Sequence, residues 1–320
     1  MAHSRQSLSR PYSGQSKRSK GIIMPHALTL VASDTPLSAG HLAKVEGFIG
    51  THGLSLIDDP VWLNPHKAVD FKISDCLNKS QMDELRQELN QNHIDVFCTA
   101  LAGRRKKLLC ADMESTIIKN EMLEELAEEL GLRDTIAEIT QRSMNGEIDF
   151  TQSLIERVAM LKDLSETKLT DSLPTLKINT GAKTLVQTMK KFGTTCVLVT
   201  GGFTFFSDYI AKKIGFDHHH ANILDIQGGK LTGKLASEVL DPDSKLRFLE
   251  QYCQTLGIQT SETLALGDGA NDLPMLTKAG LGAGYYPKPA LKDVLMNQIL
   301  HTDFTSVLYA QGYNISDFIE

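Results

Sequence analysis

The stretch LALGDGAND, from Leu264 to Asp272, decides the fold of this chain. Its first four residues predict a short buried strand, and two acids, an asparagine and two glycines follow or border it on a tight loop. Similar apolar runs recur along the chain between helical patterns, which is typical of a parallel sheet with helices on both faces. These runs are Lys107–Ala111, Cys196–Thr200 and Leu281–Gly284. We therefore predict an α/β fold with a doubly wound parallel sheet, whose ligands bind beyond the carboxyl ends of the strands.

Two acids follow the first of these strands. Asp112 comes directly after Ala111, and Glu114 lies two residues further on. A carboxylate at a buried strand end is unusual unless it has a function, because burial of a charge is costly. Asp112 is suited to attack phosphorus as a nucleophile, and Glu114 is suited to protonate a leaving group and later to deprotonate water. The alternative is a pair of acids at a helix N-terminus, where the helix dipole favours them.

The other strand ends carry groups suited to phosphate and metal. The hydroxyl of Thr200 and the bare amides at Gly201 suit a phosphate oxygen, although a glycine turn has the same pattern. Lys245 could hold phosphate as a point charge or simply lie at the surface. Asp268, with Asn271 and Asp272, offers the hard oxygen ligands that Mg²⁺ prefers; an Asx-type turn is the alternative. The residues in question are Thr200, Gly201, Lys245, Asp268, Asn271 and Asp272.

These groups, in this order, resemble the motifs of haloacid dehalogenase-type phosphatases and, within them, of the phosphoserine phosphatases. The resemblance covers roughly the last two-thirds of the chain. It implies a Rossmann-like core with a small helical cap, an aspartyl-phosphate intermediate and Mg²⁺ as the cofactor. It also implies a set of roles: Asp112 as nucleophile, Glu114 as general acid and base, Thr200, Gly201, Lys245 and Asn271 as phosphate ligands, Asp112, Asp268 and the main-chain carbonyl of Glu114 as metal ligands, and Asp272 as a support of the metal site.

The insert between the first two motifs, about residues 119–180, resembles the cap of that family. Asn120–Leu130 has one apolar helical face. The resemblance implies that Glu121 pairs with the ammonium of O-phospho-L-serine and Arg157 with its carboxylate. Outside the family match, Glu121 would be an ordinary first-turn acid and Arg157 an exposed helix arginine. The expected reaction is hydrolysis of phosphoserine, the last step of L-serine biosynthesis.

The sequence departs from the family pattern at Glu114, where the family has aspartate. The extra methylene moves the carboxyl by about one bond length, and a misplacement of roughly 1 Å can cost about 10²-fold in rate. We therefore expect an active but slowed enzyme. Two alternatives stay open: a phosphatase for another small phosphate ester, and an amino-acid-binding regulatory protein whose chemistry has decayed.

Two segments precede the phosphatase domain, which we expect over residues 103–320. Residues 1–23 are basic, serine-rich and free of acids, which predicts a disordered tail. Residues 24–102 show the order βαββαβ of a ferredoxin-like, ACT-like domain, which could bind a regulator or mediate a homodimer. Its predicted strands are Ala27–Ser33, Leu54–Leu63, Ala68–Ile73 and Ile94–Thr99. The basic linker from Gly103 to Lys107 is expected to be solvated.

The composition argues against several classes of protein. A formal net charge of −6 is unlike that of a nucleic-acid binder, and no apolar run is long enough to span a bilayer. Five scattered cysteines without a C-x-x-C pair predict no disulfide framework and a reducing cytoplasm. His218–His220 predicts a surface loop rather than a metal site, and Ala221–Thr232 predicts a hairpin. The expected partner is a small-molecule substrate, with no nucleic acid and no membrane.

Overall fold

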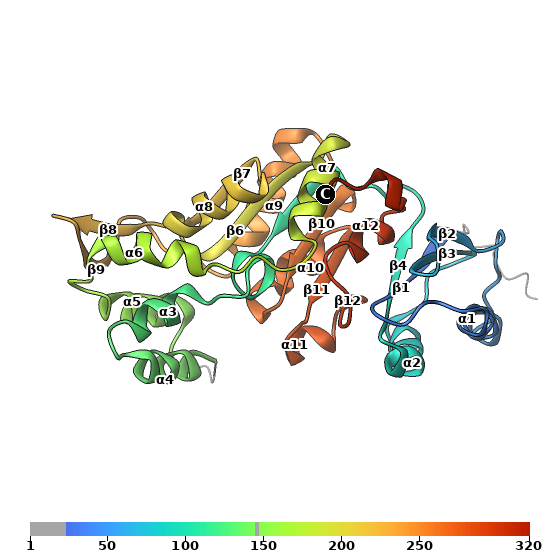
Figure 1. Ribbon diagram of the computed structural model, residues 1–320, viewed down its shortest axis with the longest axis horizontal. Coiled ribbons are helices and arrows are strands. Elements are labelled where there is room, and N and C mark those ends of the chain that lie inside the picture. The colour runs from blue at the N-terminus through green and yellow to red at the C-terminus, as the bar shows by residue number, and fades with distance from the viewer. Residues whose placement is uncertain (1–23, 145–146) are drawn as a thin grey trace, which may run out of the picture.

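The computed structural model describes residues 24–144 and 147–320. The tail predicted over residues 1–23, and residues 145 and 146 of the cap, lie outside the described residues. The molecule is elongated: a small sheet with two helices lies at one end, a larger sheet in the middle, and a group of short helices at the other end (Figure 1). Within the described ranges, no helix is long and apolar enough to cross a membrane.

The small N-terminal sheet is antiparallel, with the strand order β2-β3-β1-β4. Its elements follow the chain order β1 (His26–Ala32), α1 (Ala39–Thr51), β2 (Val61–Asn64), β3 (Ala68–Ile73), α2 (Lys79–Leu89) and β4 (Ile94–Ala100). This order confirms the predicted ferredoxin-like arrangement. The strand predicted over Leu54–Leu63 was wrong in extent, because residues before Val61 form only one isolated bridge, from Leu56 to Ile73. The Asp58-Asp59-Pro60 segment supplies the turn residues that break the strand.

The central sheet is wholly parallel and has the order β12-β11-β10-β5-β6-β7. Its strands are β5 (Leu108–Ala111), β6 (Thr195–Phe203), β7 (His218–Asn222), β10 (Thr263–Gly267), β11 (Leu281–Tyr285) and β12 (Asn297–Ile299). This topology confirms the predicted doubly wound α/β class. All four apolar runs singled out in the sequence are strands of this one sheet.

Helices cover both faces of the central sheet, because alternate strand residues point to opposite sides. Leu109 and Ala111 belong to the core under α7 (Ala182–Lys191), α8 (Thr204–Ile214) and α12 (Ser306–Ala310). Leu108 and Cys110 belong to the core under α9 (Ser244–Leu256), α10 (Leu273–Lys278) and α11 (Pro289–Lys292). Every residue of β5 is therefore buried, and a ligand can reach this strand only at its ends.

The triple histidine lies on strand β7 and not in the surface loop that the sequence predicted. His218, His219 and His220 pair in parallel register with residues 197–199 of β6. The prediction was wrong because β7 is at the edge of the sheet, where polar side chains find stacking and hydrogen-bonding partners. A run of polar residues therefore does not exclude a strand there. The ring of His220 stacks on Phe248 at 3.9 Å between centroids, and His219 Nδ1 lies 2.8 Å from the hydroxyl of Ser207.

The cap comprises four helices and a hairpin. Its elements are α3 (Met122–Glu128), α4 (Arg133–Met144), α5 (Phe150–Ala159), α6 (Glu166–Ser172), β8 (Leu224–Gln227) and β9 (Lys230–Leu235). The helix expected within Asn120–Leu130 and the hairpin expected within Ala221–Thr232 are thus present, with shifted ends. Leu231 exchanges backbone hydrogen bonds with residues 163 and 164, which ties the hairpin to the segment between α5 and α6.

The linker between the two sheets is solvated only in part. Gly103, Arg105 and Lys107 are exposed, as predicted, whereas the side chain of Arg104 is mostly covered. Arg104 binds both carboxylate oxygens of Asp70 on β3, at 2.5 and 2.8 Å, and its Nε donates to the carbonyl of Ala310 after α12. Lys106 is also buried and donates to the carbonyl of Ser261. The pattern of consecutive basic residues could not reveal this, because Asp70, a buried acid that needs a partner, lies far away in the sequence.

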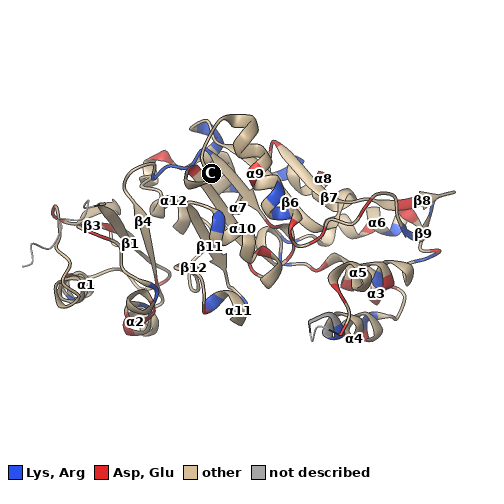
Figure 2. Cartoon of the chain, turned by 180° about the vertical axis from the view of Figure 1, so that it is seen from behind, with Lys and Arg blue, Asp and Glu red and all other residues tan. Residues whose placement is uncertain are grey.

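Charges of both signs are interspersed on the outer helices. Figure 2 shows basic and acidic residues together on α2, where Lys79 and Arg86 both pair with Asp83. Arg86 also donates to the carbonyl of Met296, just before β12. The two sheets are thus joined by polar contacts from α2 as well as by Arg104.

Candidate active site

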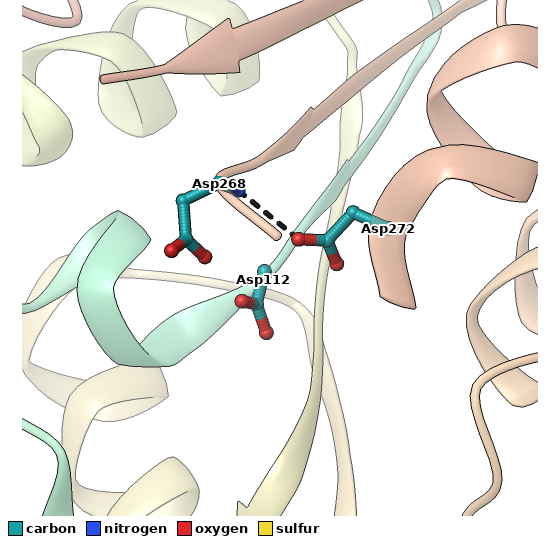
Figure 3. A group of neighbouring side chains, drawn as sticks. All are labelled: Asp112, Asp268 and Asp272. Carbon is teal, nitrogen blue, oxygen red and sulfur yellow. Dashed lines mark hydrogen bonds between the residues drawn. The ribbon is translucent and has the colours of Figure 1, made fainter. Parts of the chain in front are cut away.

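Three carboxylates meet at the carboxyl end of the central sheet (Figure 3). Asp112 follows β5, while Asp268 and Asp272 lie in the turn that follows β10. The two strands pair in parallel register, with Ala111 opposite Leu266, so their ends lie side by side. All three side chains are buried, and one oxygen of each lies within 4.8 Å of the others. The sheet geometry therefore brings together acids that are far apart in the sequence.

Lys245 lies among these acids. It is in the first turn of α9, is buried, and its Nζ lies 2.6 Å from Oδ1 of Asp112 and 2.5 Å from Oδ1 of Asp272. One buried cation against three buried acids leaves an excess of negative charge. Hard carboxylate oxygens with such an excess suit a divalent metal ion. The donor set therefore fits a metal site.

The electrostatics of the site reflect this crowding. Burial raises the pKa of Asp112 to about 8; Asp272 and Asp268 add to this rise, and Lys245 opposes it. Burial acts to lower the pKa of Lys245, but the carboxylates of Asp112 and Asp272 outweigh it and raise that pKa above the ordinary lysine value. The lysine is therefore a permanent cation, whereas Asp112 ionises less readily than an ordinary aspartate.

The loop after β10 is shaped around Asp272. Oδ2 of this side chain accepts hydrogen bonds from the main-chain amides of Asp268 and Gly269, both at 3.0 Å. A Cβ atom at Gly267 would lie 2.4 Å from Cγ of Asp272, so only glycine fits at that position. Asp272 is thus fixed by its own loop and by Lys245, while the carboxylate of Asp268 is left to face Asp112.

Glu114 is held beside the end of β6 and the start of the cap. Its backbone leaves the helical region, and its Oε1 accepts a hydrogen bond from the amide of Met122 at 3.0 Å. A Cβ atom at Gly202 would lie 2.9 Å from Oε2 of Glu114, so the glycine makes room for the carboxylate. Burial and then the nearby Glu121 raise the pKa of Glu114 to about 8. This rise favours the protonated form of Glu114 at neutral pH.

Glu121 and Arg157 lie on cap segments near this acid but do not form an ion pair with each other. Ser115, in the left-handed region with φ of 52°, donates to Oε1 of Glu121 at 2.6 Å. Arg157 on α5 donates to the carbonyl of Ser153 and to the hydroxyl of Thr140. Burial lowers the pKa of Arg157, while Glu114 and Glu121 act to raise it. Within the described chain, the guanidinium makes no ion pair and can accept an incoming carboxylate.

The residues predicted to bind phosphate surround one small cavity. It is lined by Thr200, Gly201, Lys245 and Asn271, with Phe150 of the cap beside Gly201. The hydroxyl of Thr200 accepts a hydrogen bond from the amide of Gly202, which orients the turn after β6. The four predicted residues, which are spread over more than 70 positions of sequence, thus share one wall of the site.

Sequence reasoning missed Lys288 and Thr116. The Nζ of Lys288 lies 3.0 Å from Oδ2 of Asp268, and its amide donates to the carbonyl of Asp268. Thr116 donates to Oδ1 of the same carboxylate at 3.3 Å. Lys288 follows β11, so its position after the fourth apolar run was the signal that could have identified it. A residue that follows a fourth strand, β11, therefore also contacts the acid cluster.

The model of the haloacid dehalogenase-like hydrolase family matches residues 109–277, which contain the three clustered acids and Lys245. The chain belongs to this family. Several relatives, and a solved structure that covers both sheets, carry the name phosphoserine phosphatase or probable phosphoserine phosphatase.

Phosphoserine phosphatase of Streptomyces coelicolor is 35% identical over 78% of this chain, and phosphoserine phosphatase SerB2 of Mycobacterium tuberculosis is 32% identical over 91% of it. The chain covers 61% of the first protein and 72% of the second. The structure of a probable phosphoserine phosphatase from Vibrio cholerae superposes with a TM-score of 0.73 at 28% identity, covering 91% of this chain and 88% of that one. The chain thus spans about three-fifths of the Streptomyces relative.

Proposed function

We propose that this protein hydrolyses O-phospho-L-serine to L-serine and phosphate in a Mg²⁺-dependent reaction. The observation that carries the proposal is the cavity lined by Thr200, Gly201 and Asn271, because the lysine that completes it, Lys245, also binds Asp112. A phosphate group in this cavity would lie beside a carboxylate at the end of a strand. The names of the relatives support the choice of substrate.

In the proposed first step, a carboxylate oxygen of Asp112 attacks phosphorus and the bond from phosphorus to the seryl oxygen breaks. Glu114 gives its proton to that oxygen, and L-serine leaves. Water then attacks the phosphorus of the aspartyl phosphate and passes a proton to Glu114, so that phosphate departs and both acids are restored. The pKa of Glu114, raised to about 8 by burial, supports its role as a proton donor at neutral pH.

Lys245 would hold the phosphate by charge, while Thr200, Gly201 and Asn271 donate hydrogen bonds to its oxygens. Asp112, Asp268 and the main-chain carbonyl of Glu114 would hold Mg²⁺, with Asp272 as support. Two amides and Lys245 already engage Asp272, which favours a supporting role for it. The bound ion would supply positive charge that offsets the repulsion between the phosphate and the acids.

Glu121 and Arg157 would select the amino-acid part of the substrate. The acid would accept the ammonium, and the guanidinium, which forms no ion pair within the described residues, would bind the carboxylate. Both groups are largely removed from solvent, where such contacts are stronger than at an exposed surface. We also propose a cytoplasmic location, which the five free thiols support.

The test is phosphate release from O-phospho-L-serine with and without Mg²⁺, compared with O-phosphothreonine and p-nitrophenyl phosphate. We expect metal-dependent turnover with a strong preference for phosphoserine, and loss of turnover in Asp112→Asn. Equal turnover of all three esters would contradict the assignment of Glu121 and Arg157. No turnover of any ester by folded, metal-loaded protein would reject the proposed function.

A further inference from the structure

Two cysteines of the N-terminal sheet lie in direct contact. Sγ of Cys76 is 3.2 Å from Sγ of Cys98, and both residues are free thiols. A disulfide has a sulfur–sulfur distance of about 2.05 Å, so an approach of roughly 1 Å would join them. The pair was not visible in the sequence, where the two residues are 22 positions apart and form no C-x-x-C motif.

The two thiols differ in their surroundings. Cys98 is on β4, within the core that the sheet forms with α1 and α2. Cys76 lies in the segment that joins β3 to α2, is only partly buried, and is the most accessible of the five cysteines. The hydrogen bond from Cys98 lowers the pKa of the Cys76 thiol, whereas that same bond and burial raise the pKa of Cys98. The accessible member of the pair is therefore the one that ionises more readily.

We infer that Cys76 and Cys98 form an oxidative modification site. On exposure to a peroxide, the two thiols form a reversible intramolecular disulfide. The thiolate of Cys76 attacks one peroxide oxygen and the O–O bond breaks, so that Cys76 becomes a sulfenic acid. The departing hydroxide takes up the proton that the thiol had released and leaves as water. The thiol of Cys98 then attacks that sulfur, and its proton leaves with the hydroxyl as a second water. The two thiols lose two protons and two electrons in all, and one hydrogen peroxide becomes two waters.

The other three cysteines do not share this arrangement. Cys110 and Cys196 are fully buried in the central sheet, and Cys253 is buried on α9. Within the described chain, Cys76 and Cys98 are the thiols whose sulfur atoms make a mutual hydrogen bond. Oxidation by a peroxide should therefore be selective, because a second thiol captures the sulfenic acid at this site before it is oxidised further.

The disulfide would act on the junction between the two sheets. The amide of Cys98 donates to Oδ1 of Asn297 on β12 at 2.8 Å, so the modified strand is itself bound to the central sheet. A bond from Cys76 to Cys98 would fasten the start of α2 to β4 and restrict the unfolded chain. We therefore expect the oxidised protein to melt at a higher temperature than the reduced one.

The experiment treats the full, folded chain with a small excess of hydrogen peroxide. It then removes the peroxide, denatures the protein in the presence of an alkylating agent that blocks the free thiols, and digests with trypsin without reductant. Trypsin separates the two cysteines, because residues 73–79 and 87–104 form different peptides. We expect these peptides joined in one species that dithiothreitol splits, and a higher melting temperature before reduction. The inference would be overturned if the two peptides stay separate, with their cysteines either alkylated or oxidised to sulfinic acid.

Two variants sharpen the test. Cys76→Ser should form no linked peptide and leave Cys98 as a thiol. Cys253→Ser removes a buried thiol of α9, outside the N-terminal sheet, so this variant should give the linked peptides to the same extent as the parent. Linkage that involves a cysteine other than Cys76 and Cys98 in the parent would also overturn the assignment.

Discussion

The carboxylate of Glu114 accepts a hydrogen bond from the main-chain amide of Met122, with 3.0 Å between Oε1 and the nitrogen. Met122 is the first residue of α3, and the first amides of a helix lack partners within the helix. Glu114 therefore satisfies one of these amides and links the turn after Asp112 to the cap. An aspartate is one methylene shorter and could not make this bond without a shift of the backbone.

This contact bears on the expectation that glutamate slows the enzyme. In Glu114→Asp the carboxylate loses the Met122 amide and is drawn back toward Asp112. We expect a higher kcat for phosphoserine than in the parent, together with a loss of stability of about 1 kcal/mol for the missing hydrogen bond. Steady-state kinetics and thermal unfolding of the same preparation measure both effects.

Glu114→Gln is the matched control, because it keeps the length of the side chain but cannot transfer a proton. It should lower kcat by about 10² to 10⁴-fold. A Glu114→Asp enzyme that is no faster than the parent would show that the glutamate carboxylate is already well placed, and the idea of a misplaced acid would fail.

The raised pKa values predict how the stability of the metal-free protein depends on pH. Burial raises the pKa values of Asp112 and Glu114 to about 8 in the folded state, so between their ordinary values and pH 8 the folded protein binds more protons than the unfolded chain. The free energy of unfolding should therefore fall as the pH rises through this range. Thermal unfolding in a chelator at pH 5.5 and 8.5 checks this sign.

The double variant Asp112→Asn, Glu114→Gln should flatten that pH dependence, since both titrating groups are gone. Adding Mg²⁺ at pH 8.5 should restore stability to the parent, because a metal ion binds the deprotonated acids. A melting temperature of the chelated parent that rises with pH across this range would contradict the prediction.

Arg157→Ala should change substrate preference without harming the chemistry. A hydrogen bond to a charged group contributes about 1.5–3 kcal/mol, so KM for phosphoserine should rise roughly 10- to 100-fold. Turnover of p-nitrophenyl phosphate should be unchanged, because that ester has no carboxylate. Arg133→Ala, on the exposed pair with Glu128, is the control and should affect neither substrate. Equal losses on both esters would assign Arg157 a structural role instead.

Lys288→Met should strengthen the binding of Mg²⁺. The ammonium, which is half-exposed, lies 3.0 Å from Oδ2 of Asp268 and competes with a cation for that carboxylate. A unit charge at this range in a largely aqueous setting contributes about 1 kcal/mol, so Mg²⁺ affinity should rise about fivefold. Calorimetric titration of Mg²⁺ measures it, with Lys292→Met, an exposed lysine of α11, as the control. Unchanged or weaker binding of Mg²⁺ would show that Lys288 mainly positions Asp268 and does not compete with the metal ion for its carboxylate.

Gly202→Ala should lower kcat with little effect on KM. The new Cβ would lie 2.9 Å from Oε2 of Glu114 and would push the carboxylate away from its place. A displacement of about 1 Å can cost roughly 10²-fold in rate. Gly50→Ala is the matched control, because a Cβ there meets no atom within 4 Å. If the two variants are equally active, the carboxylate adapts and its position is not critical.

The sequence predicted the central sheet and the strand ends after which its candidate site residues lie, because both depend on local patterns. A buried strand in a parallel sheet needs a run of apolar residues, and an acid directly after such a run has to lie at the carboxyl end of the sheet. Asp112, Thr200 and Asp268 could be placed on this basis alone. The pattern was less reliable at edges: the strand expected over Leu54–Leu63 is mostly absent, and the loop expected at His218–His220 is strand β7.

By itself, then, the sequence determined the α/β class, the strand ends that carry the acids, and the glycines that their loops require. Tertiary structure alone decided which distant groups meet: Lys288 with Asp268, Arg104 with Asp70, and Cys76 with Cys98. The physical reason is that strand and turn preferences act over a few neighbouring residues. Contacts between distant residues depend on how whole sheets and helices pack, and packing is a property of the folded chain as a whole.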